Sequence, residues 1–248
     1  MNHIYSKLRV ILPRRSHIKA LLFFLLLGAF SNRSAAQLVL SANKTAAILA
    51  NALAGSGVTI MAPTLTCAGN ANAIFWTGAV SPLGIPNGIV LTNGDAVDST
   101  IAGVFGYGVG DASSNFASTG NGTPGDPQLT VLAGNPTFDA CILQFNFKPA
   151  GDTIKFKYVF GSEEYTDYTC SPFNDVFAFF ITGGAYTTAT NLALVPGTNI
   201  PVAVNSVNCG ATGGYTIGAC NAMGAGSPFC AYYVNNLLTT SVAYNYVT

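Results

Sequence analysis

After residue 33 the chain has no histidine, no arginine and little basic charge. The absence of histidine excludes serine–histidine and cysteine–histidine nucleophile systems, and it excludes histidine-bound zinc, copper or iron. Nucleic acid is excluded as a partner, because too few basic residues remain to neutralise its phosphates. The basic residues after position 33 are Lys44, Lys148, Lys155 and Lys157.

Charge of either sign is scarce, since Asp, Glu, Lys and Arg make up 8% of the chain against a usual ~25%. Glycine, asparagine, threonine and serine take the polar positions instead. Such a composition is typical of an extracellular β protein and not of a disordered chain. The chemistry that remains is that of oxygen groups, namely carboxylates, amides, hydroxyls and carbonyls.

The first 36 residues have the three parts of an export signal. Basic residues precede an 11-residue apolar run, Ala20 to Phe30, and small residues follow at Ser34-Ala35-Ala36. The run is shorter than the ~20 residues of a membrane span, so we expect no span in the mature chain. Residues 1–36 are therefore predicted to be a signal peptide and 37–248 one exported domain, extracellular or on the cell surface. Four basic and ten acidic residues give this domain a net charge of −6.

All six cysteines lie after the predicted signal. An even number in an exported chain predicts up to three disulfides, although six cysteines allow 15 pairings and the sequence does not choose among them. Buried free thiols and a four-cysteine zinc site are the alternatives, but no CxxC spacing supports zinc. The disulfide candidates are Cys67, Cys141, Cys170, Cys209, Cys220 and Cys230.

The hydrophobic pattern predicts one helix followed by many strands. Ser41 is the expected N-cap of a helix over Ala42 to Ala54, which Gly55 ends. Residues 138–147 and 153–160 alternate with period two, and the Pro-Ala-Gly-Asp turn between them predicts a hairpin. Further strands are expected at 58–61, 73–77, 88–92, 175–182, 191–195, 202–204, 231–234 and 242–248, with a long polar loop over 96–128.

This pattern predicts a mainly β fold, an antiparallel β-sandwich of jelly-roll type with one short N-terminal helix. Several blocks also resemble the choice-of-anchor L domain of exported, Bacteroidota-type bacterial surface proteins. The most specific are the FGSEEY block and the NDVFAFF block that follows it. In chain order the blocks are GIVLTNG (88–94), GDP (125–127), DA (139–140), KYVFGSEEY (157–165), NDVFAFF (174–180) and LALVPGT (192–198).

The resemblance implies an exported β-sandwich module with no enzymatic activity or ligand common to the family. Members of the family continue into further strands and a C-terminal sorting segment, whereas this chain ends at Tyr244-Asn245-Tyr246-Val247-Thr248. We therefore expect a domain that is truncated at its C-terminus.

An acidic block beside these motifs has three interpretations. Calcium is one, because a hard cation takes six to eight oxygens from clustered carboxylates, amides and carbonyls. Acid–base hydrolysis of a polysaccharide is a second, with one of Glu163 and Glu164 paired with Asp175 about 5 to 10 Å away. The third is structural, in which these side chains accept hydrogen bonds at a strand end. The calcium ligands expected are Glu163, Glu164, Asp167, Asn174 and Asp175, with Asp126 more distant.

These observations favour a non-catalytic surface or secreted module for adhesion or recognition, stabilised by calcium. Its expected partners are extracellular glycans or surface proteins. The alternatives are a carboxylate-dependent polysaccharide hydrolase and a structural spacer without a ligand. Trp76 with Phe75, and Tyr232 with Tyr233, are aromatic candidates for stacking on sugars, although aromatic residues on strands more often form the core.

Overall fold

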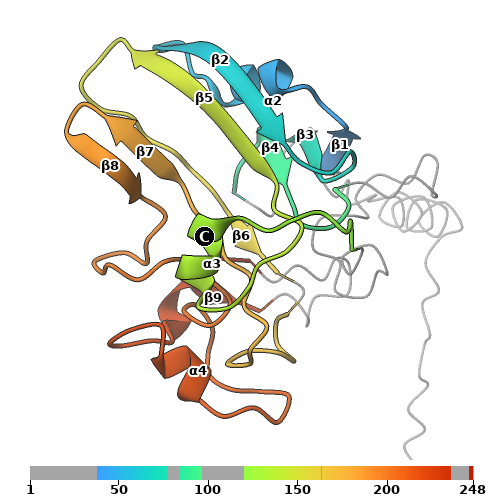
Figure 1. Cartoon of the computed structure of the whole chain (residues 1–248), viewed down its shortest axis with the longest axis vertical. Helices are drawn as coiled ribbons and strands as arrows, with labels where there is room; N and C mark the ends of the chain where they lie inside the picture. Colours follow the sequence, from blue (N-terminus) through green and yellow to red (C-terminus); the bar gives the residue numbers. More distant parts are fainter. Residues whose placement is uncertain (1–37, 78–83, 97–119, 163, 236–245, 248) are drawn as a thin grey trace, which may run out of the picture. The chain divides into compact units, whose positions relative to one another are not determined.

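A computed structural model of the chain describes residues 38–77, 84–96, 120–162, 164–235 and 246–247 (Figure 1). All of them lie in the compact unit from Ala36 to Thr248. In chain order the elements are β1 (Leu38–Ala42), α2 (Ala46–Leu53), β2 (Val58–Thr66), β3 (Asn72–Thr77), β4 (Asn87–Leu91), α3 (Pro127–Ala133), β5 (Ile142–Pro149), β6 (Phe160–Gly161), β7 (Phe180–Gly183), β8 (Tyr186–Asn191), α4 (Gly218–Asn221), the 3-10 turn η1 (Cys230–Tyr232), β9 (Tyr233–Val234) and β10 (Tyr246–Val247).

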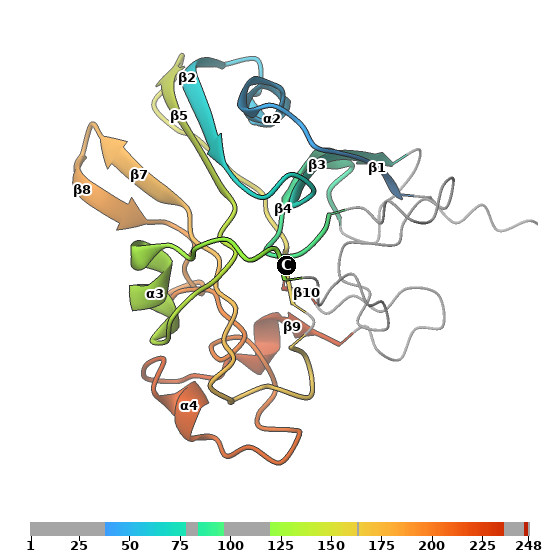
Figure 2. The same cartoon turned by 45° about the vertical axis from the view of Figure 1, so that its right-hand side comes forward.

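The strands described here pair in antiparallel fashion throughout. They form sheets in the orders β1-β3-β4 and β6-β10-β9 and the two-stranded pairs β2-β5 and β7-β8. Figure 2 shows the β7-β8 hairpin in orange and the β2-β5 pair beside α2. The predicted mainly β, antiparallel fold is confirmed.

The N-terminal helix exists but begins later than predicted. Ser41 and Ala42 belong to β1 and pair with β3, opposite Ile74 and Ala73. The helix α2 is capped instead by Thr45, whose hydroxyl accepts a hydrogen bond from the backbone N–H of Ile48 at 3.4 Å. Serine and threonine can both cap a helix, and Thr45 is the cap here because Ser41 is paired with β3.

A helix that the sequence pattern did not predict lies just beyond the polar stretch. The carboxylate of Asp126 accepts hydrogen bonds from Gln128 N (2.8 Å) and Leu129 N (3.0 Å), and this caps α3. Pro127 occupies the first turn, where its missing N–H costs nothing, and Gly134 ends the helix at φ 74°. Most of the predicted loop over 96–128 lies outside the described residues.

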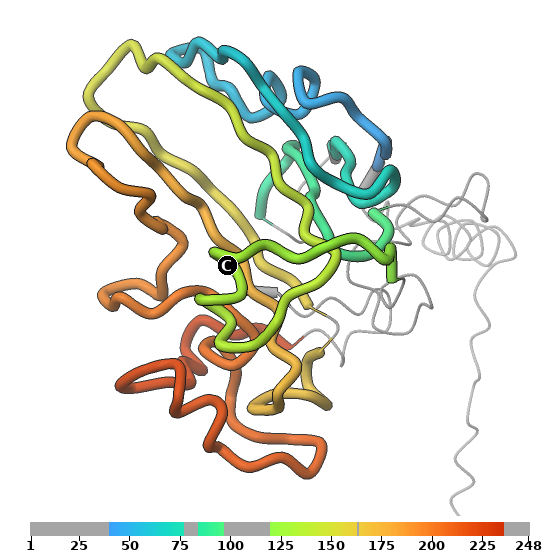
Figure 3. The backbone as a smooth tube through the Cα atoms, viewed as in Figure 1, coloured from blue at the N-terminus to red at the C-terminus, as the bar shows by residue number. Residues whose placement is uncertain are grey.

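The predicted hairpin of 138–147 with 153–160 is wrong, because β5 pairs with β2 over Ile142–Pro149. Residues 153–159 run extended without joining a strand ladder among the described residues (yellow between β5 and β6 in Figure 3). Their aromatic rings pack on the segment before β7: Phe156 on Phe179 at 4.2 Å between ring centroids, and Tyr158 on Phe177 at 4.9 Å. Ring packing takes the place of the expected backbone pairing.

The other predicted strands are partly confirmed. The predictions at 58–61, 73–77 and 88–92 fall on β2, β3 and β4. The strand expected at 175–182 is regular only from Phe180. The predictions at 191–195 and 202–204 reduce largely to single bridges, Leu194 to Pro201 and Ala203 to Val176. Of the strand expected at 242–248, only β10 lies within the described residues.

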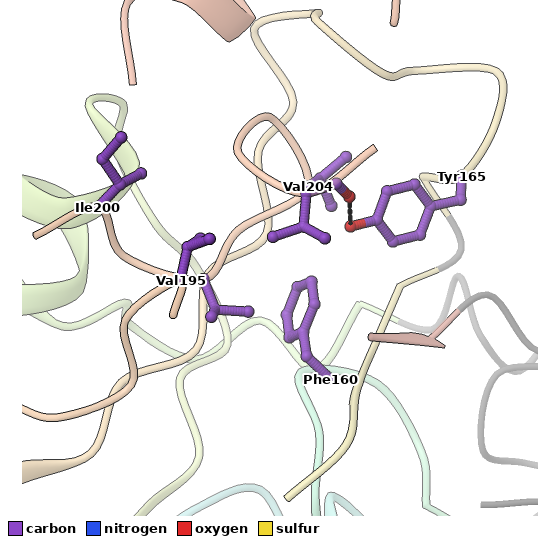
Figure 4. Close-up of a cluster of buried hydrophobic side chains, with 7 residues drawn as sticks. Phe160, Tyr165, Val195, Ile200 and Val204 are labelled. Atoms are coloured by element: carbon purple, nitrogen blue, oxygen red, sulfur yellow. Dashed lines mark hydrogen bonds between the residues drawn. The ribbon is translucent and has the colours of Figure 1, made fainter. Parts of the chain in front are cut away.

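The main hydrophobic cluster includes side chains of the FGSEEY block (Figure 4). It joins the valine-rich segment after β8 to the two aromatic residues of the block. The Tyr165 hydroxyl donates a hydrogen bond to the backbone carbonyl of Val207 at 2.6 Å, so the ring both packs and satisfies a buried carbonyl. The cluster consists of Phe160, Tyr165, Val195, Ile200, Val202, Val204 and Val207.

Candidate functional site

Three of the resemblance blocks meet at Asp175. One carboxylate oxygen of Asp175 accepts a hydrogen bond from the Ser162 hydroxyl at 2.6 Å. The other accepts from the side-chain amide of Asn93 at 3.2 Å, a residue 82 positions earlier in the chain. Ser162 in turn accepts the backbone N–H of Glu164 at 3.1 Å. These bonds fix the bend after Phe160, which supports the structural interpretation of the acidic block.

A second carboxylate holds the neighbouring segment in the same way. The side-chain amide of Asn121 donates to the carbonyl of Asn93 at 2.9 Å. The backbone N–H of Asn121 donates to Asp139 at 3.1 Å, and the Thr123 hydroxyl donates to the same carboxylate at 3.0 Å. Asp139 and Asp175 are thus linked through Asn93 and Asn121.

The fold shifts the pKa values of the two carboxyl groups in opposite directions. Burial raises the pKa of Asp175 above its ordinary value, and the hydrogen bonds from Ser162 and Asn93 only partly oppose this. Burial also raises the pKa of Asp139, but hydrogen bonds from Thr123 and Asn121 outweigh it and leave that pKa below its ordinary value. Folding therefore favours the protonated form of Asp175 and the ionised form of Asp139.

This contrast predicts the pH dependence of two matched variants. The stability that Asp175 contributes is present below its unfolded pKa, 3.8, and is lost as pH rises through the higher folded value. Asp139 contributes stability above 3.8 that is lost as pH falls through its lower folded value. Relative to wild type, Asp175→Asn should therefore gain unfolding free energy as pH rises, and Asp139→Asn should lose it. Urea unfolding from acid to neutral pH measures both, and parallel curves would contradict the assignment.

The predicted calcium ligands that the structure describes have separate local partners. Asp126 caps α3, and Asn174 is engaged on both sides, donating to the Ala133 carbonyl and accepting from Asn205 N, each at 2.9 Å. Asp167 is exposed, and Glu163 lies outside the described residues. In the described part of the chain, no three His, Cys, Asp or Glu side chains gather as metal ligands would. Calcium stays a prediction.

The six cysteines form three disulfides: Cys67–Cys141, Cys170–Cys220 and Cys209–Cys230. No thiolate therefore remains for the alternative zinc site. Two of the bonds lie in the C-terminal third. Cys170–Cys220 joins the first loop (residues 164–173) to α4, and Cys209–Cys230 joins the second loop (residues 208–217) to η1.

Hydrogen bonds and a close backbone contact hold the two loops together. The Thr169 hydroxyl donates to the Gly210 carbonyl at 3.0 Å and lies 2.8 Å from the hydroxyl of Thr212. Gly213 packs its backbone directly on the Asp167 carbonyl, with no room for a Cβ. Beneath the first loop, the buried amide of Asn205 accepts from Cys170 N and donates to the Ser171 carbonyl, each at 2.7 Å. This network predicts a fixed loop geometry.

Aromatic rings project from this fixed pair of loops. Tyr168 is 43% exposed and Phe173 56% exposed, and their ring centroids are 5.4 Å apart in an edge-to-face arrangement. Tyr215 from the second loop lies 6.2 Å from Tyr168, with Ile217 exposed nearby in sequence. We call Tyr168, Phe173 and Tyr215 the aromatic cluster.

The aromatic cluster was not among the stacking candidates that the sequence suggested. Of those candidates, Phe75 is buried. Tyr233 packs on Tyr165, with 4.9 Å between the ring centroids, and burial raises the pKa of Tyr233 to about 12. Trp76 is exposed on β3. A sequence signal for the cluster did exist, because its rings lie within a few residues of cysteines in the stretches YTCSPF and CGATGGY.

Comparisons with known proteins match the resemblance drawn from the motifs. No curated protein and no solved structure matches the chain. The family model of the choice-of-anchor L domain matches residues 34–248, which include the whole described part and every motif block named above. The chain therefore belongs to the choice-of-anchor L domain family.

Proposed function

We propose that this domain acts outside the cell as a non-catalytic module for adhesion or recognition. We further propose that it binds polar ligands, and that glycans are the first class to test. One observation carries the proposal: two loops, each anchored by a disulfide and bonded to one another through Thr169, present aromatic rings to solvent in a fixed geometry. Exposed apolar groups on a rigid, polar surface are typical of sites that bind other molecules.

Family membership and chemistry agree with this setting. The choice-of-anchor L family indicates a surface-associated, non-catalytic module, and three disulfides are consistent with an extracellular or surface protein. Among the described residues, no helix has the length and apolar character that crossing a bilayer requires.

The hydrolase alternative needs a carboxyl that is free to act on a substrate. Both oxygens of Asp175 are engaged, by Ser162 and by Asn93, in bonds that hold the fold. This arrangement favours binding over turnover. The spacer alternative gives no reason for solvent-exposed rings on loops that disulfides anchor.

The experiment is a glycan array combined with an adhesion assay on intact cells, both with the exported, oxidised protein. The proposal expects saturable binding in at least one of the two. Blank results in both would contradict it, and product release from a polysaccharide panel, lost in Glu164→Gln, would favour the hydrolase instead.

Calcium stabilisation is the further part of the proposal, with Glu164 and Asp175 as the expected ligands. An ion present at 100 times its Kd adds about 2.7 kcal/mol to the unfolding free energy, which raises Tm by several degrees in a domain of this size. The expected result is a higher Tm in millimolar calcium than in excess chelator. An unchanged transition would contradict calcium binding and would leave adhesion untouched.

A further inference from the structure

We infer that the aromatic cluster is a binding site for neutral oligosaccharides. The inference rests on the proposed function and names where the ligand binds. Tyr168 and Tyr215 combine an apolar ring with a hydroxyl that has no hydrogen-bond partner in the described structure. A sugar ring offers the matching surfaces, an apolar C–H face for stacking and an edge of hydroxyls for hydrogen bonds.

The charge around the cluster favours an uncharged ligand. Glu164 and Asp167 are the two charged residues of the first loop, and the second loop has none. Neither loop has a cation that could pair with a phosphate, sulfate or uronic acid, and Glu164 and Asp167 would repel one. Exposed threonines at positions 212 and 216 and the adjoining glycine backbone add neutral donors and acceptors.

The size of the cluster favours a small ligand over a protein partner. A fully buried aromatic side chain covers about 150–250 Å², so the half-exposed rings of Tyr168 and Phe173, with the less exposed Tyr215, offer at most about 300 Å² together. A partner in a stable protein complex usually contributes about 800 Å². A few stacked sugar units match the smaller area.

The loops meet the remaining requirement, which is preorganisation. The positions of the rings are fixed before a ligand arrives by two disulfides, Cys170–Cys220 and Cys209–Cys230, and by the hydrogen bonds of Thr169 and Asn205. Binding then costs little ordering of the protein, which is what lets a small, neutral contact surface retain a ligand.

The test is calorimetric titration of the exported, oxidised protein with cello-, manno-, xylo- and chito-hexaose. We expect saturable binding of at least one, weakened about tenfold or more in both Tyr168→Ala and Phe173→Ala. Tyr168→Phe, which keeps the ring, should stay closer to wild type than Tyr168→Ala. The matched control is Phe138→Ala, which removes a ring that is 72% exposed elsewhere and should leave binding unchanged.

Because these side chains are exposed, the variants should keep the wild-type Tm within about 2 °C, and a melt of each confirms it. Unchanged hexaose binding in Tyr168→Ala and Phe173→Ala would overturn the assignment, even if the protein still adheres to cells. An equal loss in Phe138→Ala would overturn it as well. Failure of the wild type to bind any hexaose or any cell would overturn both this site and the proposed function.

Discussion

Serine in place of both Cys170 and Cys220 is expected to lower the unfolding free energy by about 4 kcal/mol and to abolish hexaose binding at the aromatic cluster. The two residues are 50 positions apart, so the bond removes a large part of the loop entropy of the unfolded chain. It also joins the first loop to α4, directly after the second loop. Chemical denaturation and calorimetric titration of the double variant measure the two effects.

The matched control is serine at both Cys67 and Cys141. These residues are 74 positions apart, and the same chain-entropy relation gives a loss of about 4 kcal/mol. Their bond links the residue after β2 to the residue before β5, away from the two loops in sequence. This variant should therefore be destabilised to a similar degree and still bind. Equal binding by the two double variants would show that the Cys170–Cys220 bond does not shape the site.

Alanine at Gly213 is expected to cost about 3 kcal/mol or more. Gly213 has φ 61°, in the left-handed region, where an L side chain costs about 1–2 kcal/mol. Its Cβ would also overlap the Asp167 carbonyl, and relieving such overlap costs about 1–3 kcal/mol more. The two loops would have to separate, so urea unfolding should show the loss of stability and titration should show weaker hexaose binding.

Gly214→Ala separates the two contributions. Gly214 has φ 88°, but a Cβ there meets nothing within 4 Å. Only the backbone strain applies, and the expected loss is about 1–2 kcal/mol. A loss in Gly213→Ala no greater than in Gly214→Ala would show that the close contact between Gly213 and Asp167 does not hold the loops.

Local patterns predicted the fold class well but not all of its elements. The local hydrophobic pattern located β2, β3, β4 and β5, although the equally alternating residues 153–159 form no regular strand. The helix signals at Asp126, Pro127 and Gly134 were equally local, yet the surrounding polar stretch favoured a loop. The start of α2 depended on the pairing of β1 with β3, in which Ser41 lies opposite Ile74, 33 residues later in the chain, so no local signal could reveal it.

The candidate site depended still more on distant contacts. The even cysteine count predicted disulfides correctly, but choosing among 15 pairings needs three-dimensional proximity. The acidic block was visible in the sequence, whereas the partners of Asp175 were not, since Asn93 lies 82 residues away. The aromatic cluster likewise joins residues 168 and 215, which only the fold brings together.

The most direct measurement of the central claim follows binding and cleavage in one sample. The exported, oxidised protein is incubated with the hexaose panel, and bound sugar and released products are both quantified over time. The account predicts saturable retention of intact hexaose with no shorter product. Steady accumulation of shorter sugars, abolished by Glu164→Gln, would contradict it.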